Sequence, residues 1–194
     1  MALNGLVGAS AVAELALAVD VGKGNKAGIA PHVPEGYPNI TANDGPLKNA
    51  YQTFNTVKAR EIPPGETLYR VVDPGSLDNR VCWMRKEEFD KLTSKADWRR
   101  RFAVWANWNG NGEFVTYTVP PGKPLKVWEG KTASQNLDNS DYWLEGGAVQ
   151  IVLDPKDLEK SFLGKRQSTG WGYTDFGTPT DKVGVPQLTN NWKE

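Results

Sequence analysis

The chain has 194 residues, and its 23 lysines and arginines balance 23 aspartates and glutamates, so the formal net charge is zero. Proteins that bind along a nucleic-acid backbone usually carry an excess of basic residues, and this chain has none, so no nucleic-acid partner is expected. The single cysteine, Cys82, excludes an internal disulfide, and the single histidine, His32, excludes a histidine-rich metal site. A catalytic triad would have to use His32, which lies between prolines in a loop-like context.

The first 46 residues differ in composition from the rest of the chain. Residues 1–20 are rich in alanine, leucine and valine, but they lack a basic start and contain Glu14, so neither a signal peptide nor a membrane span is expected. Helical spacing predicts a helix from Ser10 to Val19, and the glycines and prolines of residues 21–46 predict a linker. A domain of residues 47–194 is expected to follow, and the N-terminal stretch could equally join an upstream domain of a larger protein.

The remaining elements are predicted to be two helices and a series of short strands. Apolar spacing predicts helices over residues 47–60 and 86–101. Asp154 is expected to cap a helical turn that has Pro155 at its first position. Because alternating strand-helix-strand units are absent, the predicted fold class is α+β with mostly antiparallel strands. Strands are predicted at residues 67–72, 101–105, 113–119, 124–128 and 147–153, with the second and third forming a hairpin around Asn109–Gly112.

Two polar residues stand inside apolar strands. Alternation places Arg70 on the face of Leu68 and Val72, where its guanidinium needs a carboxylate or a phosphate as partner. Gln150 lies in an apolar run after Gly146-Gly147, so its amide is either satisfied by backbone groups or faces a cleft. The two glycines let the backbone approach a ligand or another strand closely.

Two further features are less specific. The segment from Lys131 to Gln135 places hydroxyl and amide side chains after Gly130, as in ligand-binding loops and in ordinary turns alike. The chain also has eight tryptophans, most of which are expected in the core, while some could stack on a planar ligand.

The order of these motifs resembles the NAD-glycohydrolase toxins of the tuberculosis necrotizing toxin family. The resemblance spans residues 63–153 and departs from the family in the tryptophan-rich residues 98–108, in the glycine-rich tail and in the lack of a histidine. It implies the fold of bacterial ADP-ribosylating toxins. The motifs that carry it are Leu68-Tyr69-Arg70-Val71-Val72, Tyr117-Thr118-Val119, Pro124-Leu125-Lys126-Val127 followed by Gly130, and Gly146-Gly147-x-x-Gln150.

The resemblance also implies a set of site residues. Arg70 matches the arginine that holds the dinucleotide phosphates, and Gln150 matches the catalytic glutamine. No metal and no cofactor other than NAD⁺ or NADP⁺ as substrate are expected. The expected substrate-binding residues are Tyr69, Tyr117, Trp128, Ser134, Gln135 and Glu145, with Tyr117 or Trp128 as a stacking wall.

The activity implied is hydrolysis of NAD⁺ to nicotinamide and ADP-ribose, which needs no imidazole because nicotinamide leaves as a neutral group. As implied by the resemblance, residues 47–194 are the catalytic toxin domain of a secreted bacterial effector. That effector acts in the target-cell cytosol and is restrained by a cognate immunity protein. One alternative is a mono-ADP-ribosyltransferase with Thr116 and Thr118 as the hydroxyl strand, although the chain has no Glu-x-Glu motif. The second alternative is a tryptophan-rich, non-catalytic binding module.

Overall fold

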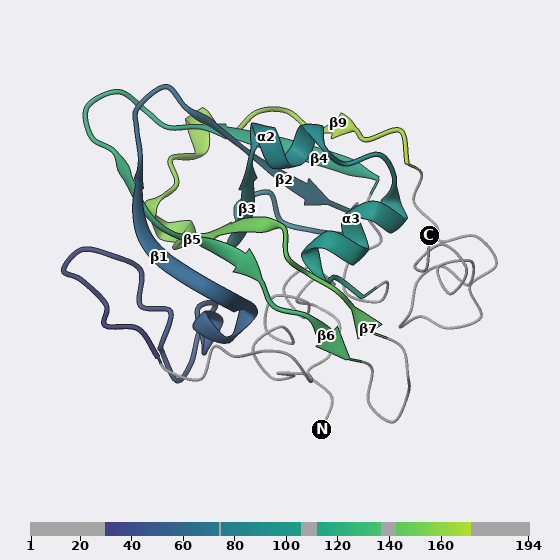
Figure 1. Cartoon of the computed structure of the whole chain (residues 1–194). Coiled ribbons are helices and arrows are strands. Elements are labelled where there is room, and N and C mark those ends of the chain that lie inside the picture. The colour runs from purple at the N-terminus through teal and green to yellow at the C-terminus, as the bar shows by residue number, and fades with distance from the viewer. Residues whose placement is uncertain (1–29, 74, 106–111, 137–142, 172–194) are drawn as a thin grey trace.

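The computed structural model describes residues 30–73, 75–105, 112–136 and 143–171 (Figure 1). Its centre is a seven-stranded sheet in the order β1-β5-β8-β3-β2-β4-β9, and every neighbouring pair in it is antiparallel. A second sheet pairs β6 with β7, also antiparallel. The predicted α+β class with mostly antiparallel strands is therefore confirmed.

The strands are connected by short helices and turns. The helices are α2 (Lys86–Asp90), α3 (Lys95–Phe102) and the 3₁₀ turns η1 (Ala50–Thr53), η2 (Pro155–Asp157) and η3 (Lys160–Phe162). The strands are β1 (Phe54–Ile62), β2 (Thr67–Val72), β3 (Cys82–Arg85), β4 (Glu113–Thr118), β5 (Leu125–Thr132), β6 (Gln135–Asn136), β7 (Trp143–Leu144), β8 (Val149–Val152) and β9 (Gln167–Ser168).

The large sheet buries apolar side chains on both of its faces, and the clusters distinguish the two. On one face, which we call the 3₁₀ face, Leu68, Trp83 and Ile151 pack with Leu158 of the segment that holds the 3₁₀ turns η2 and η3. The other face, which we call the helix face, is covered near β2 and β3 by α2 and α3 (Figure 1). Farther along the helix face, residues 33–54 pack on Trp128 and Val152.

Residues 30–49, which precede η1 and β1, form no helix or strand, and they are part of the core. Ile40 and Leu47 are buried against Trp128, whose indole nitrogen donates to the Pro38 carbonyl at 2.7 Å. The helix predicted at residues 10–19 lies outside the described residues. Across those described, no helix combines the length and apolar character that crossing a membrane would need.

The predicted helix over residues 47–60 is wrong. Only the short turn η1 is helical, and β1 begins at Phe54 and pairs with β5 along its length. Val57 and Ala59 are half-buried while Thr56 and Lys58 are exposed, which is the two-residue period of a strand. The apolar spacing that favours a helix locally is overridden by pairing with a strand about 70 residues farther along the chain.

The helix predicted over residues 86–101 is interrupted. Ser94 caps a new helix, because its hydroxyl accepts from the Asp97 backbone nitrogen at 3.1 Å, and α3 therefore starts after a break at residues 91–94. The predicted hairpin is also wrong, since Arg101 belongs to α3 and β4 pairs with β2 and β9 instead. Most of its predicted turn, residues 109–111, lies outside the described residues.

Several local predictions are confirmed. The strand at residues 67–72 has its predicted bounds, and β4 and β8 lie within theirs. The predicted strand at residues 124–128 is found as β5, which continues to Thr132. The Asp154 carboxylate accepts from the Lys156 backbone nitrogen at 3.0 Å, and Pro155 opens η2.

Candidate functional site

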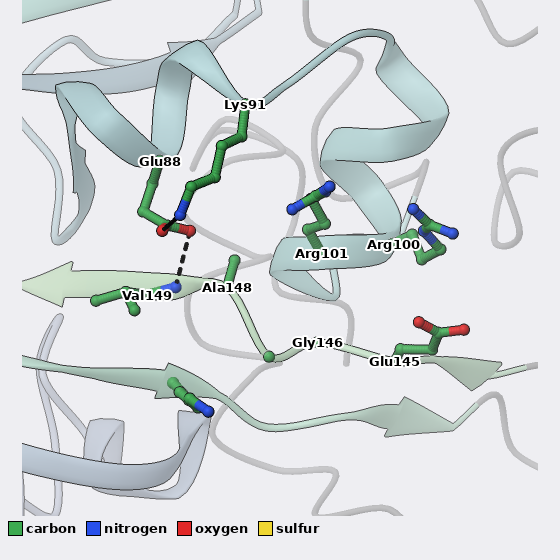
Figure 2. Close-up of a pocket in the computed structure, with 10 residues that line it drawn as sticks. Glu88, Lys91, Arg100, Arg101, Glu145, Gly146, Ala148 and Val149 are labelled. Atoms are coloured by element: carbon green, nitrogen blue, oxygen red, sulfur yellow. Dashed lines mark hydrogen bonds and ion pairs between the residues drawn. The ribbon is translucent and has the colours of Figure 1, made fainter.

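A cavity of about 430 Å³ opens where β8 begins, beside α2 and the end of α3 (Figure 2). Four cationic side chains line it against two carboxylates, so its wall carries a surplus of positive charge. We call it the β8 cavity. Its charged lining residues are Glu88, Lys91, Arg100, Arg101, Lys131 and Glu145, and its other lining residues are Gly146, Gly147, Ala148 and Val149.

The two arginines of the β8 cavity are held by one carboxylate. Arg100 and Arg101 lie in the last turn of α3, and Asp97 bonds to them at 3.0 and 2.8 Å. Burial raises the pKa of Asp97, but hydrogen bonds from Arg101, from the Thr93 backbone and from Arg100, together with the charge of Arg101, outweigh it and leave that pKa below its ordinary value. Asp97 thus orders both guanidinium groups, whose remaining N–H groups can bind an anion.

The glycine pair forms the floor of the β8 cavity and is tied to α3. The Gly146 nitrogen donates to the Arg100 carbonyl at 2.9 Å, and the Ala148 nitrogen donates to the Arg101 carbonyl at 3.1 Å. At Gly146 the backbone has a φ of +70°, and a Cβ there would lie 2.5 Å from the Ala133 carbonyl oxygen. Glycine is therefore required at this position by close approach of another backbone segment.

Glu88 joins α2 to the first residue of β8. One carboxylate oxygen accepts from the Val149 backbone nitrogen at 3.2 Å, and the other accepts from Lys91 at 2.5 Å (Figure 2). Lys131, on the neighbouring strand β5, is exposed and has no ion-pair partner among the described residues. Because Lys131 pairs with Val149, alternation places its side chain on the sheet face opposite to Gln150.

Gln150, the predicted catalytic residue, follows Val149 on β8 and is only 3% exposed. Its amide nitrogen donates to the hydroxyl of Thr53 at 2.8 Å and to the Thr53 carbonyl at 3.1 Å. By alternation it shares the helix face with Ala148 and Val152. Ala148 lines the β8 cavity, whereas Gln150 lies two residues farther along the strand and is not among the lining residues. The sequence left two interpretations of this amide, namely that protein groups satisfy it or that it faces a cleft. The structure shows the first for the amide nitrogen, which donates to Thr53.

Arg70, predicted to hold phosphates, lies on the 3₁₀ face with Leu68 and Val72. It is 3% exposed, and its guanidinium donates to the Cys82 carbonyl at 2.9 Å. The structure therefore does not bring Arg70 and Gln150 to one face of the sheet. Arg70 is not among the residues that line the β8 cavity.

The predicted aromatic residues are all packed against protein. Tyr117 lies on the 3₁₀ face, where its hydroxyl accepts a hydrogen bond from the Glu159 backbone nitrogen at 3.3 Å. Burial raises the pKa of this hydroxyl. Trp128 is buried beneath Tyr37, with ring centroids 6.0 Å apart. Tyr69 is half-buried and stacks on Phe89 at 4.8 Å. Neither Tyr117 nor Trp128, the two candidates for a stacking wall, lines the β8 cavity.

The remaining predicted residues differ in exposure. Glu145 is exposed and lines the β8 cavity. Ser134 is buried, and Gln135 is fully buried with no hydrogen-bond partner for either amide atom among the described residues. A buried amide in this state is rare in folded proteins and is costly.

Sequence reasoning missed the cations of α3 and α2 and the partner of Gln150. Arg100 and Arg101 follow Arg99 in a run of three arginines, a signal that was available but is also typical of a helix C-terminus. Thr53 carries no signal in the sequence. Within the described residues, His, Cys, Asp and Glu side chains form no group of three that could hold a metal ion.

Comparison with known proteins adds one similarity of structure. No protein-family model matches the sequence, and no curated protein matches it. The fold is similar to a chain in a solved structure described as Tne2 in complex with Tni2. The TM-score is 0.40 at 18% sequence identity, and the alignment covers 58% of this chain and 92% of that chain.

Proposed function

We propose that the protein hydrolyses NAD⁺ to nicotinamide and ADP-ribose, with the dinucleotide bound in the β8 cavity. The observation that carries the proposal is the grouping of Arg100, Arg101 and Lys131 beside the glycine pair that leads into the Gln150 strand. Guanidinium and ammonium groups suit a diphosphate, and the cavity has the volume usual for small-molecule sites, roughly 300 to 1,000 Å³. The motif resemblance supports the same chemistry.

The reaction makes modest chemical demands on the protein. The bond between the ribose C1′ and the nicotinamide nitrogen breaks, and its electron pair leaves with the neutral nicotinamide. Water adds to C1′ and gives up a proton to solvent, which yields ADP-ribose. Positioning of the dinucleotide and stabilisation of an oxocarbenium-like transition state supply most of the rate.

Gln150 is proposed to act at the ribose. Because its amide nitrogen is engaged by Thr53, its carbonyl oxygen is the atom left to accept a hydrogen bond from a ribose hydroxyl or from the attacking water. The phosphates would lie toward Arg100, Arg101 and Lys131, which moves the phosphate role from Arg70 to the cavity cations. The reaction then needs no metal and no imidazole.

The test is an assay of NAD⁺ consumption by the purified protein, with nicotinamide and ADP-ribose separated as products and NADP⁺ run in parallel. We expect turnover without any added protein, and protection of the fold by NAD⁺ against thermal unfolding. No turnover together with no protection would overturn the proposal. Consumption only in the presence of cell lysate, with ADP-ribose attached to macromolecules, would identify a transferase instead.

We extend the proposal to the setting that the motif resemblance implies. The domain would be delivered from a bacterium into the cytosol of a target cell, where a cognate immunity protein protects kin. Production of the chain in a bacterial cytosol is then expected to lower the cellular NAD⁺ pool and arrest growth. Growth arrest at an unchanged NAD⁺ level would contradict this setting.

A further inference from the structure

The side-chain amide of Gln150 is held by a residue that lies 97 positions earlier in the chain. Thr53, the last residue of η1, accepts two hydrogen bonds from the Gln150 amide nitrogen, at 2.8 Å on its hydroxyl and 3.1 Å on its carbonyl. Both residues are only 3% exposed. Water therefore competes poorly for these bonds.

The direction of each hydrogen bond follows from the neighbours of Thr53. The Thr53 hydroxyl donates its own hydrogen to the Ala50 carbonyl at 2.8 Å, so toward Gln150 it can only accept. The Thr53 carbonyl is likewise an acceptor, and it also receives the Ala133 backbone nitrogen at 2.8 Å. A flipped amide would place the Gln150 oxygen against two acceptors, so the amide has one favourable orientation.

Thr53 is itself fixed on both sides. Ala50 lies three residues before it in η1, and Phe54, the next residue, is fully buried against Trp128 and Val152. The hydroxyl therefore sits at a constant place relative to β8, the strand that carries Gln150. A side chain on a mobile loop could not define the orientation of the amide in this way.

We propose that Thr53 is a positioning residue for NAD⁺ hydrolysis, an inference that rests on the proposed function. By holding the amide nitrogen, it directs the Gln150 carbonyl oxygen to the ribose or to the attacking water. Thr53 is not among the residues that line the β8 cavity, so its effect is expected to pass through Gln150. Its loss is therefore expected to lower kcat and to leave KM for NAD⁺ nearly unchanged.

The experiment compares Thr53→Val, which keeps the shape and removes the hydroxyl, with Thr53→Ser, which keeps the hydroxyl. We expect Thr53→Val to lower kcat at least about tenfold and Thr53→Ser to stay within about threefold of wild type. The same substitutions in a Gln150→Ala background should change kcat less than about twofold, because the partner is already gone. Equal kcat in wild type and Thr53→Val, or a full Thr53→Val effect in the Gln150→Ala background, would overturn the inference.

A second measurement does not depend on activity. In the wild-type protein the two side-chain amide protons of Gln150 should exchange slowly with solvent in a nitrogen-15 NMR spectrum, and Thr53→Val should speed this exchange at least about tenfold. Slow exchange in both proteins would overturn the role of Thr53. If wild type shows no NAD⁺ turnover while the exchange behaves as expected, the proposed function fails and the hydrogen-bond geometry stands. If Thr53→Val does not fold, Thr53→Ala replaces it in both measurements.

Discussion

Arg70 and Gln150 extend from opposite faces of the seven-stranded sheet. Leu68 and Val72, which flank Arg70 on β2, pack in the same cluster as Trp83 and Ile151. Ile151 precedes Val152 and follows Gln150, so alternation turns Gln150 to the other face. A dinucleotide bound in the β8 cavity, as proposed above, would therefore lie beside α3 and the start of β8 and not against Arg70.

This separation predicts different defects for substitutions at the two positions. Arg70→Met removes a buried hydrogen bond to the Cys82 carbonyl, and we expect it to lower the free energy of unfolding by about 1–3 kcal/mol while KM for NAD⁺ changes less than about threefold. Gln150→Ala should lower kcat at least about a hundredfold. Urea unfolding and steady-state kinetics of both variants provide the measurement. A tenfold rise in KM for Arg70→Met, at unchanged stability, would return the phosphate role to Arg70.

The β8 cavity predicts a charge-dependent affinity for diphosphate groups. Lys131→Gln should weaken binding of NAD⁺ and of inorganic pyrophosphate about tenfold, because it removes an exposed cation that makes no ion pair in the described part of the chain. The difference should shrink as salt is raised. Lys156→Gln is the matched control, since Lys156 is exposed on η2 away from the cavity. Equal losses in the two variants would indicate only a general charge effect.

Acid should weaken the fold through Asp97. The pKa of Asp97 in the folded protein lies below the ordinary value of 3.8, so its ionised form contributes stability that is fully present above that value. This contribution is lost as pH falls from 3.8 through the lower folded pKa. We expect Asp97→Asn to be less stable than wild type at neutral pH and to show a flatter fall in stability under acid. Urea unfolding at a series of acidic pH values checks this.

The control for the acid series is Asp90→Asn, which removes an exposed carboxylate of α2. Its stability should fall with acid as steeply as that of wild type. An unchanged acid slope in Asp97→Asn would contradict the ion pairs with Arg100 and Arg101.

Replacing the buried amide of Gln135 is expected to raise the stability of the fold and to lower its activity. Both amide atoms of Gln135 are buried without a hydrogen-bond partner in the part of the chain that the structure describes, so Gln135→Leu should raise the free energy of unfolding by about 1–3 kcal/mol. If the amide is retained for substrate binding, the same variant should lose at least about tenfold in kcat/KM. A more stable and fully active variant would exclude Gln135 from the site, and a less stable one would contradict the burial of an unpaired amide.

The parts of the fold that the sequence predicts are those fixed by near neighbours. The strand containing Arg70 is bounded by turns and rich in β-branched residues, and the Asp154 cap involves residues two positions apart. The helix expected over residues 47–60 fails for the opposite reason. Its apolar spacing suits a helix, yet the partner that decides its structure, β5, begins at Leu125.

The candidate site was predictable to a smaller extent. The glycine pair, Glu145 and the strand of Gln150 were all identified, and the structure brings them to the β8 cavity or beside it. The orientation of Gln150 depends on Thr53, which is 97 residues away in the sequence, so no local pattern could reveal it. Arg100 and Arg101 become cavity residues only because the loop at Gly146 binds the end of α3.

The hydrogen bond from Trp128 to Pro38 has a practical consequence for where the chain can be shortened. A protein that begins at Leu47 would lack Pro38, Tyr37 and Ile40, and would leave one face of Trp128 and Phe54 in water. Buried apolar surface exposed in this way favours self-association. Truncated forms intended for crystallisation or toxicity assays should therefore retain residues from Ala30 onward, because residues 30–49 cover part of the apolar core.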